Sequence, residues 1–347
     1  MSGHHGAHPM EKPMTVTQRL LASISCAMLV TSAACGEPAR TASGAGPLVL
    51  ERTIPLAGVA GRIDHLAIDV AHGRLFIAEL GNGTVEVVDV ASGRSFRRIS
   101  GLKEPQGLAY LPDLDELVVA SGGDGSVRFY KGSDLAPAGV ISLGDDADNV
   151  RIAPSSDRVV VGYGSGALAI IDPAGLKVIG RIALPGHPES FRLAGDRAFV
   201  NVPGAQRMVV AELSSGRTVA SWHMPYLMNF PLALDRESGR VTVVFRLPAR
   251  ITSFDVTTGK TTADAATCGD SDDLFFDGRR QRFYVTCGSG NVDVVGVAPA
   301  GFGRVDHVAT RAGARTSLFV PEQDRLYVAA RARPGEKAAI LVYRPQP

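Results

Sequence analysis

The sequence predicts an all-β fold, a seven-bladed β-propeller of four-stranded antiparallel blades. Three observations support this prediction. A short apolar segment recurs seven times at intervals of about 42 residues, which is the spacing of propeller blades. Tight glycine turns separate the strands within the repeats. The last repeat is one strand short, and a matching strand lies near the start of the chain.

The N-terminal segment has the pattern of an export signal. Arg19 precedes an apolar run over residues 20–30, which is shorter than the ~20 residues that a membrane-spanning helix needs. The small residues Ser32-Ala33-Ala34 are typical of a signal cleavage site, and Cys35 resembles the lipid-modified cysteine of bacterial lipoproteins. Ordinary cleavage and lipidation at Cys35 both stay open.

This segment sets the expected organisation and location of the chain. We expect a signal over residues 1–35, a linker over 36–47 and a single propeller domain over 48–347. The protein would then be located in the periplasm or cell envelope, as a monomer that reaches a membrane only through a lipid anchor.

Each repeat begins with two short strands. The first strands begin at residues 66, 108, 150, 191, 232, 274 and 318, as in Leu66-Ala67-Ile68. A second strand follows each of them, as in Leu75-Phe76-Ile77-Ala78 and Leu117-Val118-Val119-Ala120. Turns such as Gly81-Asn82-Gly83 come next, where glycine allows the positive φ of a tight hairpin.

The third and fourth strands complete each blade, except in the last repeat. Third strands include Val85-Glu86-Val87-Val88-Asp89, and in the last repeat Ala339-Ile340-Leu341-Val342-Tyr343, after which no fourth strand follows. Residues 48–56 resemble the fourth strands of other repeats, such as residues 139–143. We therefore expect this N-terminal strand to complete blade seven and close the ring, which removes open sheet edges.

The chain resembles a known family in these repeats. Second strands such as Phe283-Tyr284-Val285-Thr286 and Leu326-Tyr327-Val328, each followed by a turn and in several repeats by a V-x-V-x-D strand, are similar to the YVTN-type (YncE-like) seven-bladed β-propellers of bacterial envelopes. The resemblance covers residues 48–345. It implies an exported scaffold and no particular activity, although the wider set of seven-bladed relatives includes lactonases and quinoprotein-like subunits.

Charge and motifs exclude several functions. The chain has 36 Lys+Arg against 35 Asp+Glu and a net charge of +1, which argues against a nucleic acid partner. It contains no C-x-x-C-H haem attachment site, no G-x-G-x-x-G opening a helix and no G-x-S-x-G elbow. Haem c and nucleotide chemistry are therefore unsupported.

Polar residues are expected to gather at one mouth of the central channel. In an up-and-down blade, the residues before the first strand and after the second strand lie at the same rim. The predicted ligand-binding residues at this mouth are Asp64, His65, Gln106, Asp148, Asn149, Glu189, Asn229, Arg246, Asp272, Asp273, Arg315 and Arg331.

Three interpretations of this mouth stay open. In the first, the polar residues only cap turns and bind nothing. In the second, Asp148, Asp272 and Asp273 hold a divalent cation such as Ca²⁺, the only cofactor that the sequence suggests. In the third, the arginines clamp an anionic or sugar-like molecule, and a carboxylate such as Glu189 serves as the base of a lactonase-like hydrolysis.

The expected function is therefore an exported scaffold that binds a small ligand or an envelope protein at a polar, acidic funnel. One alternative is a lactonase-like or metal-assisted hydrolase, for which Glu189, His65 and Arg315 are the candidate catalytic residues. A second alternative is an accessory subunit of an envelope redox complex.

Four further residues carry specific expectations. Arg151 and Arg192 lie in otherwise apolar first strands, so each must reach the channel or pair with a carboxylate. We expect Asp148 and Glu189 among their partners. Cys268 and Cys287 are expected to form a disulfide in an exported protein, with free thiols or soft metal ligands as the alternatives.

Overall fold

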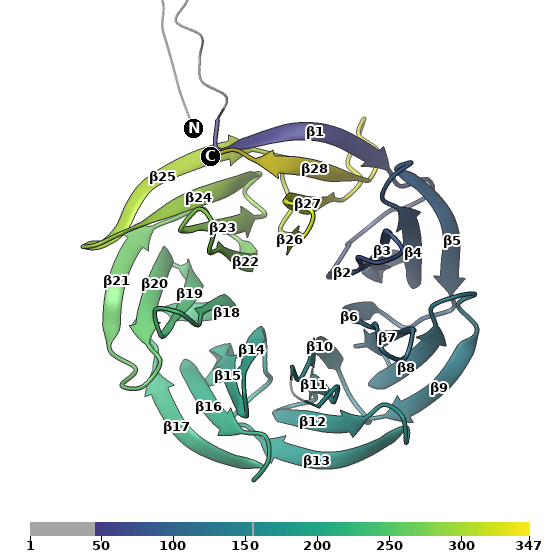
Figure 1. Cartoon of the computed structure of the whole chain (residues 1–347), viewed down its shortest axis with the longest axis horizontal. Coiled ribbons are helices and arrows are strands. Elements are labelled where there is room, and N and C mark those ends of the chain that lie inside the picture. The colour runs from purple at the N-terminus through teal and green to yellow at the C-terminus, as the bar shows by residue number, and fades with distance from the viewer. Residues whose placement is uncertain (1–45, 155) are drawn as a thin grey trace, which may run out of the picture. The chain divides into compact units, whose positions relative to one another are not determined.

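The computed structural model describes residues 46–154 and 156–347. The predicted signal, the lipidation site at Cys35 and most of the predicted linker lie outside the described residues. Seven four-stranded antiparallel sheets form a closed ring in the order of the chain (Figure 1). The predicted seven-bladed β-propeller is therefore confirmed.

In blades one to six the strands run outward from the channel in sequence order, and in blade seven the first strand of the chain is the outermost. Blade one contains β2 (Leu66–Asp69), β3 (Arg74–Glu79), β4 (Thr84–Asp89) and β5 (Arg94–Ser100). Blade two contains β6 (Pro105–Leu111), β7 (Glu116–Ser121), β8 (Ser126–Lys131) and β9 (Pro137–Ser142). Blade three contains β10 (Ala147–Ile152), β11 (Val159–Tyr163), β12 (Ala167–Asp172) and β13 (Lys177–Ala183). Blade four contains β14 (Phe191–Ala194), β15 (Arg197–Val202), β16 (Arg207–Glu212) and β17 (Arg217–His223).

The remaining blades follow the same plan. Blade five contains β18 (Leu227–Asp235), β19 (Arg240–Leu247), β20 (Ala249–Asp255) and β21 (Thr261–Ala266). Blade six contains β22 (Ser271–Asp277), β23 (Arg282–Cys287), β24 (Asn291–Ala298) and β25 (Gly301–Ala309). Blade seven contains β26 (Thr316–Val320), β27 (Arg325–Ala330), β28 (Ala339–Pro345) and β1 (Leu48–Pro55). The two helices of the described chain are the short 3₁₀ turns η1 (Leu80–Asn82) and η2 (Pro203–Ala205). Neither they nor any other described segment is a helix long and apolar enough to cross a membrane.

The ring closes as the sequence predicts, with the first strand of the chain in the last blade. β1 pairs with β28, and this pairing runs from Leu48 opposite Pro345 to Pro55 opposite Ala339. Arg282 of blade six fastens both ends, because its Nη2 donates to the carbonyl oxygens of Pro47 at 3.2 Å and Gln346 at 2.6 Å.

Apolar side chains fill the spaces between neighbouring blades. Val118 and Phe129 of blade two, for example, are fully buried against Val159 and Val161 of blade three. Burying one such side chain contributes about 1.5–3 kcal/mol. The two middle strands of a blade are buried on both faces, as in β7, and they hold the first strand rigidly at the channel.

The first strands bend at the channel mouth. In blades two, three, five and six the pairing of the first and second strands shifts register at the same place. Such a bulge re-aims the side chains around it. Gly107 lies in the blade-two bulge, where a Cβ atom would meet the backbone oxygen of Asp148 at 1.9 Å. The close approach of blades two and three at the mouth therefore requires glycine.

A disulfide joins two segments of blade six. Cys268, before β22, is bonded to Cys287 at the end of β23, with their Cα atoms 5.9 Å apart. The predicted disulfide is therefore confirmed. It encloses the Asp270 to Asp273 loop at the mouth.

Candidate functional site

The predicted mouth contains a polar cavity of about 260 Å³, which we call the mouth cavity. All seven blades, with the connections that lead into them, contribute to it. Its lining residues are Arg62, Gln106, Asp146, Asp148, His187, Glu189, Phe230, Arg246, Asp272 and Arg315.

Two arginines on one side of the mouth cavity share two carboxylates. Arg246 donates to Asp272 at 2.7 Å, and Arg315 contacts the other oxygen of Asp272 at 3.0 Å. Both arginines also contact Asp270, at 3.7 and 3.1 Å respectively. Arg246 is held in addition by the ring of Phe230, 3.8 Å from the centroid to its guanidinium carbon. The two cations are therefore already neutralised by the protein.

His187 neutralises the acidic groups on the other side. It lies 3.5 Å from Asp146 and 4.0 Å from Asp148, and its Nδ1 is 2.7 Å from the carbonyl oxygen of Gly164. Asp148 and this carbonyl raise the pKa of His187 to about 9, although burial opposes them. We infer an imidazolium at neutral pH.

Glu189 differs from the other acids that line the mouth cavity. Within residues 46–154 and 156–347 its carboxyl forms no hydrogen bond or ion pair. Burial, followed by the negative charges of Asp148 and Asp272, raises the pKa of Glu189 to about 7. It is therefore a carboxyl group that changes charge near neutral pH and has its hydrogen-bonding capacity free.

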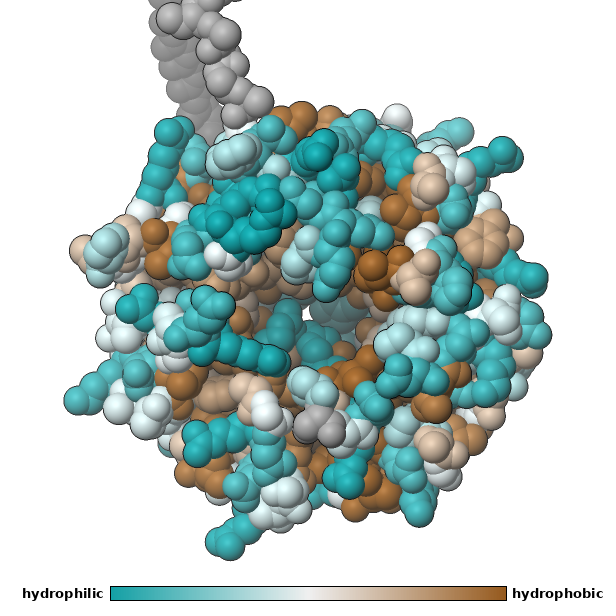
Figure 2. Space-filling model, viewed as in Figure 1, coloured by the Kyte–Doolittle hydropathy of each residue, from teal (hydrophilic) through white to brown (hydrophobic). Residues whose placement is uncertain are grey.

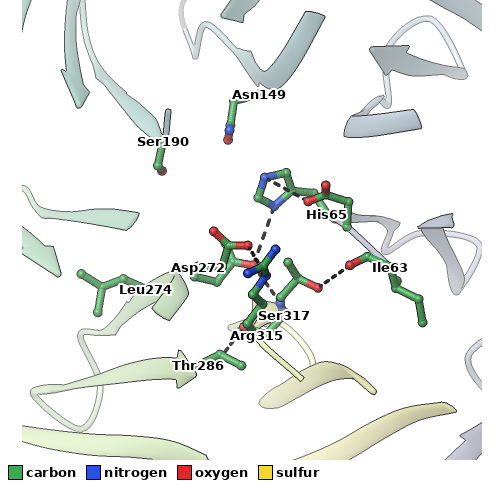
Figure 3. Close-up of polar contacts among 12 residues, drawn as sticks. Ile63, His65, Asn149, Ser190, Asp272, Leu274, Thr286, Arg315 and Ser317 are labelled. Carbon is green, nitrogen blue, oxygen red and sulfur yellow. Dashed lines mark hydrogen bonds and ion pairs between the residues drawn. The ribbon is translucent and has the colours of Figure 1, made fainter. Parts of the chain in front are cut away.

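A mostly buried cluster lies where β2 and β22 meet the channel, and we call its members His65 (Figure 3), Asp64 and Asp273 the histidine layer. The ring of His65 lies 3.8 Å from Asp64 and 3.7 Å from Asp273. Asp273 also accepts a hydrogen bond from the backbone N–H of Ser317 at 2.7 Å. Although burial lowers the pKa of His65, Asp273 and Asp64 raise it to about 10. Burial raises the pKa of Asp64 to about 6.

A second cavity, of about 310 Å³, lies deeper in the channel, and we call it the arginine chamber. Figure 2 shows the hollow at the centre of the ring, where hydrophilic and hydrophobic residues meet. The chamber is lined by His65, Leu66, Ala67, Leu108, Ala109, Tyr110, Val150, Arg151, Ile152, Arg192, Asp273, Phe275, Ser317 and Leu318.

Arg151 and Arg192 both reach the channel, which is one of the two outcomes expected from the sequence. The prediction that they pair with Asp148 and Glu189 is wrong. Arg151 donates to Asn149 at 2.9 Å and to backbone carbonyls. Arg192 donates to Ser190 and to backbone carbonyls. Asp148 lies beside His187 instead.

Six of the twelve predicted residues do not line the mouth cavity. Asp64, His65 and Asp273 form the histidine layer, and the other three lie elsewhere. Asn229 is fully buried and donates to Asn201 at 3.0 Å and to a backbone carbonyl. Asn149 is a buried acceptor for Arg151. Arg331 is exposed and lies against Gly313. The prediction missed Arg62, which contacts Asp64 at 2.8 Å and lines the mouth cavity. Its position two residues before Asp64 is the signal that could have found it.

The carboxylates predicted as metal ligands have separate cationic partners. Asp148 lies beside His187, Asp272 binds two arginines and Asp273 lies beside His65. Over the described part of the chain, no group of three or more His, Cys, Asp or Glu residues could hold a metal ion. These residues therefore do not fit a Ca²⁺ site.

Comparison with known proteins supports the fold. No protein-family model matches the chain, and no curated protein is similar to it in sequence. A chain of hydrazine synthase from Kuenenia stuttgartiensis has a TM-score of 0.69 and 16% identity, over 81% of this chain and 94% of that chain. A chain of the mitotic checkpoint complex has a TM-score of 0.73 and 14% identity, over 93% of this chain and 100% of that chain. At these identities the similarity shows the propeller fold alone.

Proposed function

We propose that the protein is a β-propeller scaffold that binds a small polar molecule in the mouth cavity, with Glu189 as the residue that selects it. The observation that carries this proposal is the carboxyl group of Glu189, which has no polar partner among the described residues in a cavity where the other acids have one. A ligand with an ammonium or hydroxyl group would supply the missing donor.

The surrounding charges favour a ligand with several polar groups. Arg62, Arg246 and Arg315 lie around Glu189 in the mouth cavity, and their carboxylate partners leave some of their N–H groups free, because a guanidinium has five. Apart from Phe230, the residues that line the cavity are polar, so an apolar ligand would leave these groups unpaired at a cost in free energy.

Three open-chain molecules of one size test the proposal: D-glucamine (1-amino-1-deoxysorbitol), D-sorbitol and D-gluconate, which are cationic, neutral and anionic at pH 8. We expect glucamine to bind most tightly at this pH by isothermal titration calorimetry. The variant Glu189→Gln should weaken it at least about tenfold, as expected for a charge-assisted hydrogen bond. The matched control is Glu237→Gln, in an exposed turn. Equal binding by both variants, or binding of none of the three molecules, would contradict the proposal.

A hydrolase is the second candidate, because a pKa of about 7 for Glu189 suits a general base at neutral pH. D-Glucono-1,5-lactone is the test substrate. Turnover by the protein should rise with an apparent pKa near that of Glu189 and disappear in Glu189→Gln. Turnover that Glu189→Gln leaves unchanged would remove this candidate.

We infer in addition that the protein is exported to the periplasm or cell envelope, as a YVTN-type propeller would be. The disulfide supports this inference, because such bonds persist in oxidising compartments. The apolar run over residues 20–30 supports it as well. Mass spectrometry of the cell-derived protein should give a chain that begins at or near Cys35, and a lipid mass on that residue would establish an anchor. Proteins that co-purify with it would test the proposal of a subunit in an envelope complex.

A further inference from the structure

The arginine chamber has an unusual combination of walls. Leu108, Val150 and Phe275 supply apolar surface, and two guanidinium groups, of Arg151 and Arg192, supply charge. Neither arginine forms an ion pair within the described ranges 46–154 and 156–347. Removing a cation from water without a counter-ion is costly, and a protein does not gain by this arrangement unless something else supplies the negative charge.

The two guanidinium groups converge. Both donate to the backbone oxygen of Phe191, from Nε of Arg151 at 3.1 Å and from Nη1 of Arg192 at 3.2 Å. Their positive charges are therefore close, and burial together with the charge of Arg192 lowers the pKa of Arg151 to about 9. The aromatic rings of Phe191 and Phe275 offset this repulsion only in part, at 5.5 and 5.9 Å.

Both groups have hydrogen-bond donors to spare. Arg151 uses three of its five N–H groups, on the oxygens of Phe191, Val150 and Asn149. Arg192 also makes three hydrogen bonds, the longest at 3.5 Å. Each arginine therefore keeps about two N–H groups without an acceptor among the described residues.

The acid of the chamber wall, Asp273, acts on both arginines through its charge but forms no ion pair with them among the described residues. It lies beside His65 and accepts the backbone N–H of Ser317. The charged groups of the chamber wall are thus three cations, His65, Arg151 and Arg192, and one carboxylate. An anion with one carboxylate could accept N–H groups from both arginines, and the apolar wall would hold its hydrocarbon part.

From this geometry we propose that the arginine chamber is a second binding site, for a carboxylate with an apolar tail. The site is separate from the mouth cavity, from which the histidine layer divides it, and the proposal does not depend on the function proposed for the mouth. The tail would lie against Leu108 and Phe275, and the carboxylate would bridge Arg151 and Arg192.

Octanoate is the probe, with acetate and 1-octanol as its two halves. Acetate carries the charge without the tail, and octanol carries the tail without the charge. In calorimetric titrations at pH 7.5, octanoate should bind at least about tenfold more tightly than acetate or octanol. Only octanoate both accepts hydrogen bonds from the arginines and buries an apolar tail against the chamber wall.

Two kinds of variant locate the site. The double variant Arg151→Met and Arg192→Met removes the charges and should weaken octanoate at least about tenfold. Ala109→Leu keeps both charges but fills part of the chamber, and it should also weaken octanoate. Arg181→Met is the matched control, because Arg181 is an exposed arginine on β13 of the same blade as Arg151, and it should bind octanoate as the wild type does. Thermal unfolding followed by circular dichroism checks that each variant is folded.

Three results would overturn the proposal. The first is octanol binding as tightly as octanoate, since this would make the arginines irrelevant. The second is unchanged octanoate binding in the double variant or, if the double variant does not fold, in both single variants. The third is no octanoate binding by the wild-type protein at millimolar concentration.

Discussion

The mouth cavity and the arginine chamber lie along the same central channel, yet their charges are organised in opposite ways. At the mouth, cations and carboxylates are paired, as in Arg246 with Asp272, and one acid, Glu189, is left over. In the chamber, two cations are held by oxygen atoms without charge, and no described acid pairs with them. The difference follows from depth. The rim is built from loops and bulges that supply both signs of charge, whereas the strands below it are mostly apolar.

The histidine layer, which lies between the two regions, should give the greatest loss of stability when it is altered. Asp273→Asn should lower the free energy of unfolding by about 3 kcal/mol, because it leaves the His65 cation buried beside one carboxylate instead of two. Against the effect of burial, Asp273 together with Asp64 and Asp148 raises the pKa of His65 from 6.5 to about 10. The stability that these carboxylates contribute through His65 is therefore complete below pH 6.5 and is lost as the pH rises through about 10. Urea unfolding at pH 6 and at pH 10 measures the change.

Asp272→Asn is the matched control for this prediction. Its two arginine partners keep Asp270, so its loss of stability should be smaller. Equal losses of stability for the two variants, or a loss in Asp273→Asn that does not shrink at pH 10, would contradict this prediction. Either result would show that Asp273 stabilises the fold no more through His65 than Asp272 does through its arginines.

The next effect concerns the acid without a partner at the mouth. Burial and its acidic neighbours raise the pKa of Glu189 from 4.5 to about 7, so the folded state holds its proton more tightly than the unfolded state does. Stability from this group is therefore lost as the pH rises from about 4.5 to about 7. Glu189→Gln should raise the free energy of unfolding at pH 8 by roughly 3 kcal/mol, at about 1.4 kcal/mol per pKa unit, and by little at pH 4. A gain that is the same at both pH values would contradict the assignment.

In the arginine chamber, replacing one of the two arginines should change the stability only slightly. Arg192→Met should raise the free energy of unfolding of the unliganded protein by about 1 kcal/mol, because an apolar side chain of similar length replaces a buried cation without a counter-ion. Arg181→Met, on the outer strand, should change it by less than about 0.5 kcal/mol. Thermal and urea unfolding measure both. A clear loss of stability in Arg192→Met would mean that the carbonyls and rings compensate the charge fully.

The sequence predicts the fold well because the strands of the repeats appear as short apolar segments at regular intervals along the chain. Residues 48–56 show this most clearly, since their place in blade seven follows from a strand missing elsewhere. The bulges are different. A register shift such as that between Pro105 and Leu108 adds a residue to one strand. Gly107 lies in this bulge, but the bulges of blades three, five and six contain no glycine, so the sequence does not predict them from a shared residue type.

The site is predictable only as far as topology places its residues. The rim position of Asp148, Glu189 and Asp272 follows from the order of strands in a blade, and these residues do line the mouth cavity. The pairing of Asp148 with Arg151 fails for a geometric reason. Three residues along a strand cover about 10 Å, and the bulge between Ala147 and Val150 re-aims the side chains around it. Asp148 therefore lies at the mouth beside His187, whereas Arg151 lines the arginine chamber.

The closure of the ring also determines how the molecule would respond to force. Leu48 and Pro345 are paired at the same end of the β1–β28 ladder, so pulling on the two chain ends would load one hydrogen-bonded pair at a time, as in opening a zipper. A shearing geometry would load all of the pairs together. The force needed to separate β1 from β28 would therefore depend on the first contacts to be loaded. These include the hydrogen bonds from Arg282 to Pro47 and Gln346, which join both strand ends to blade six.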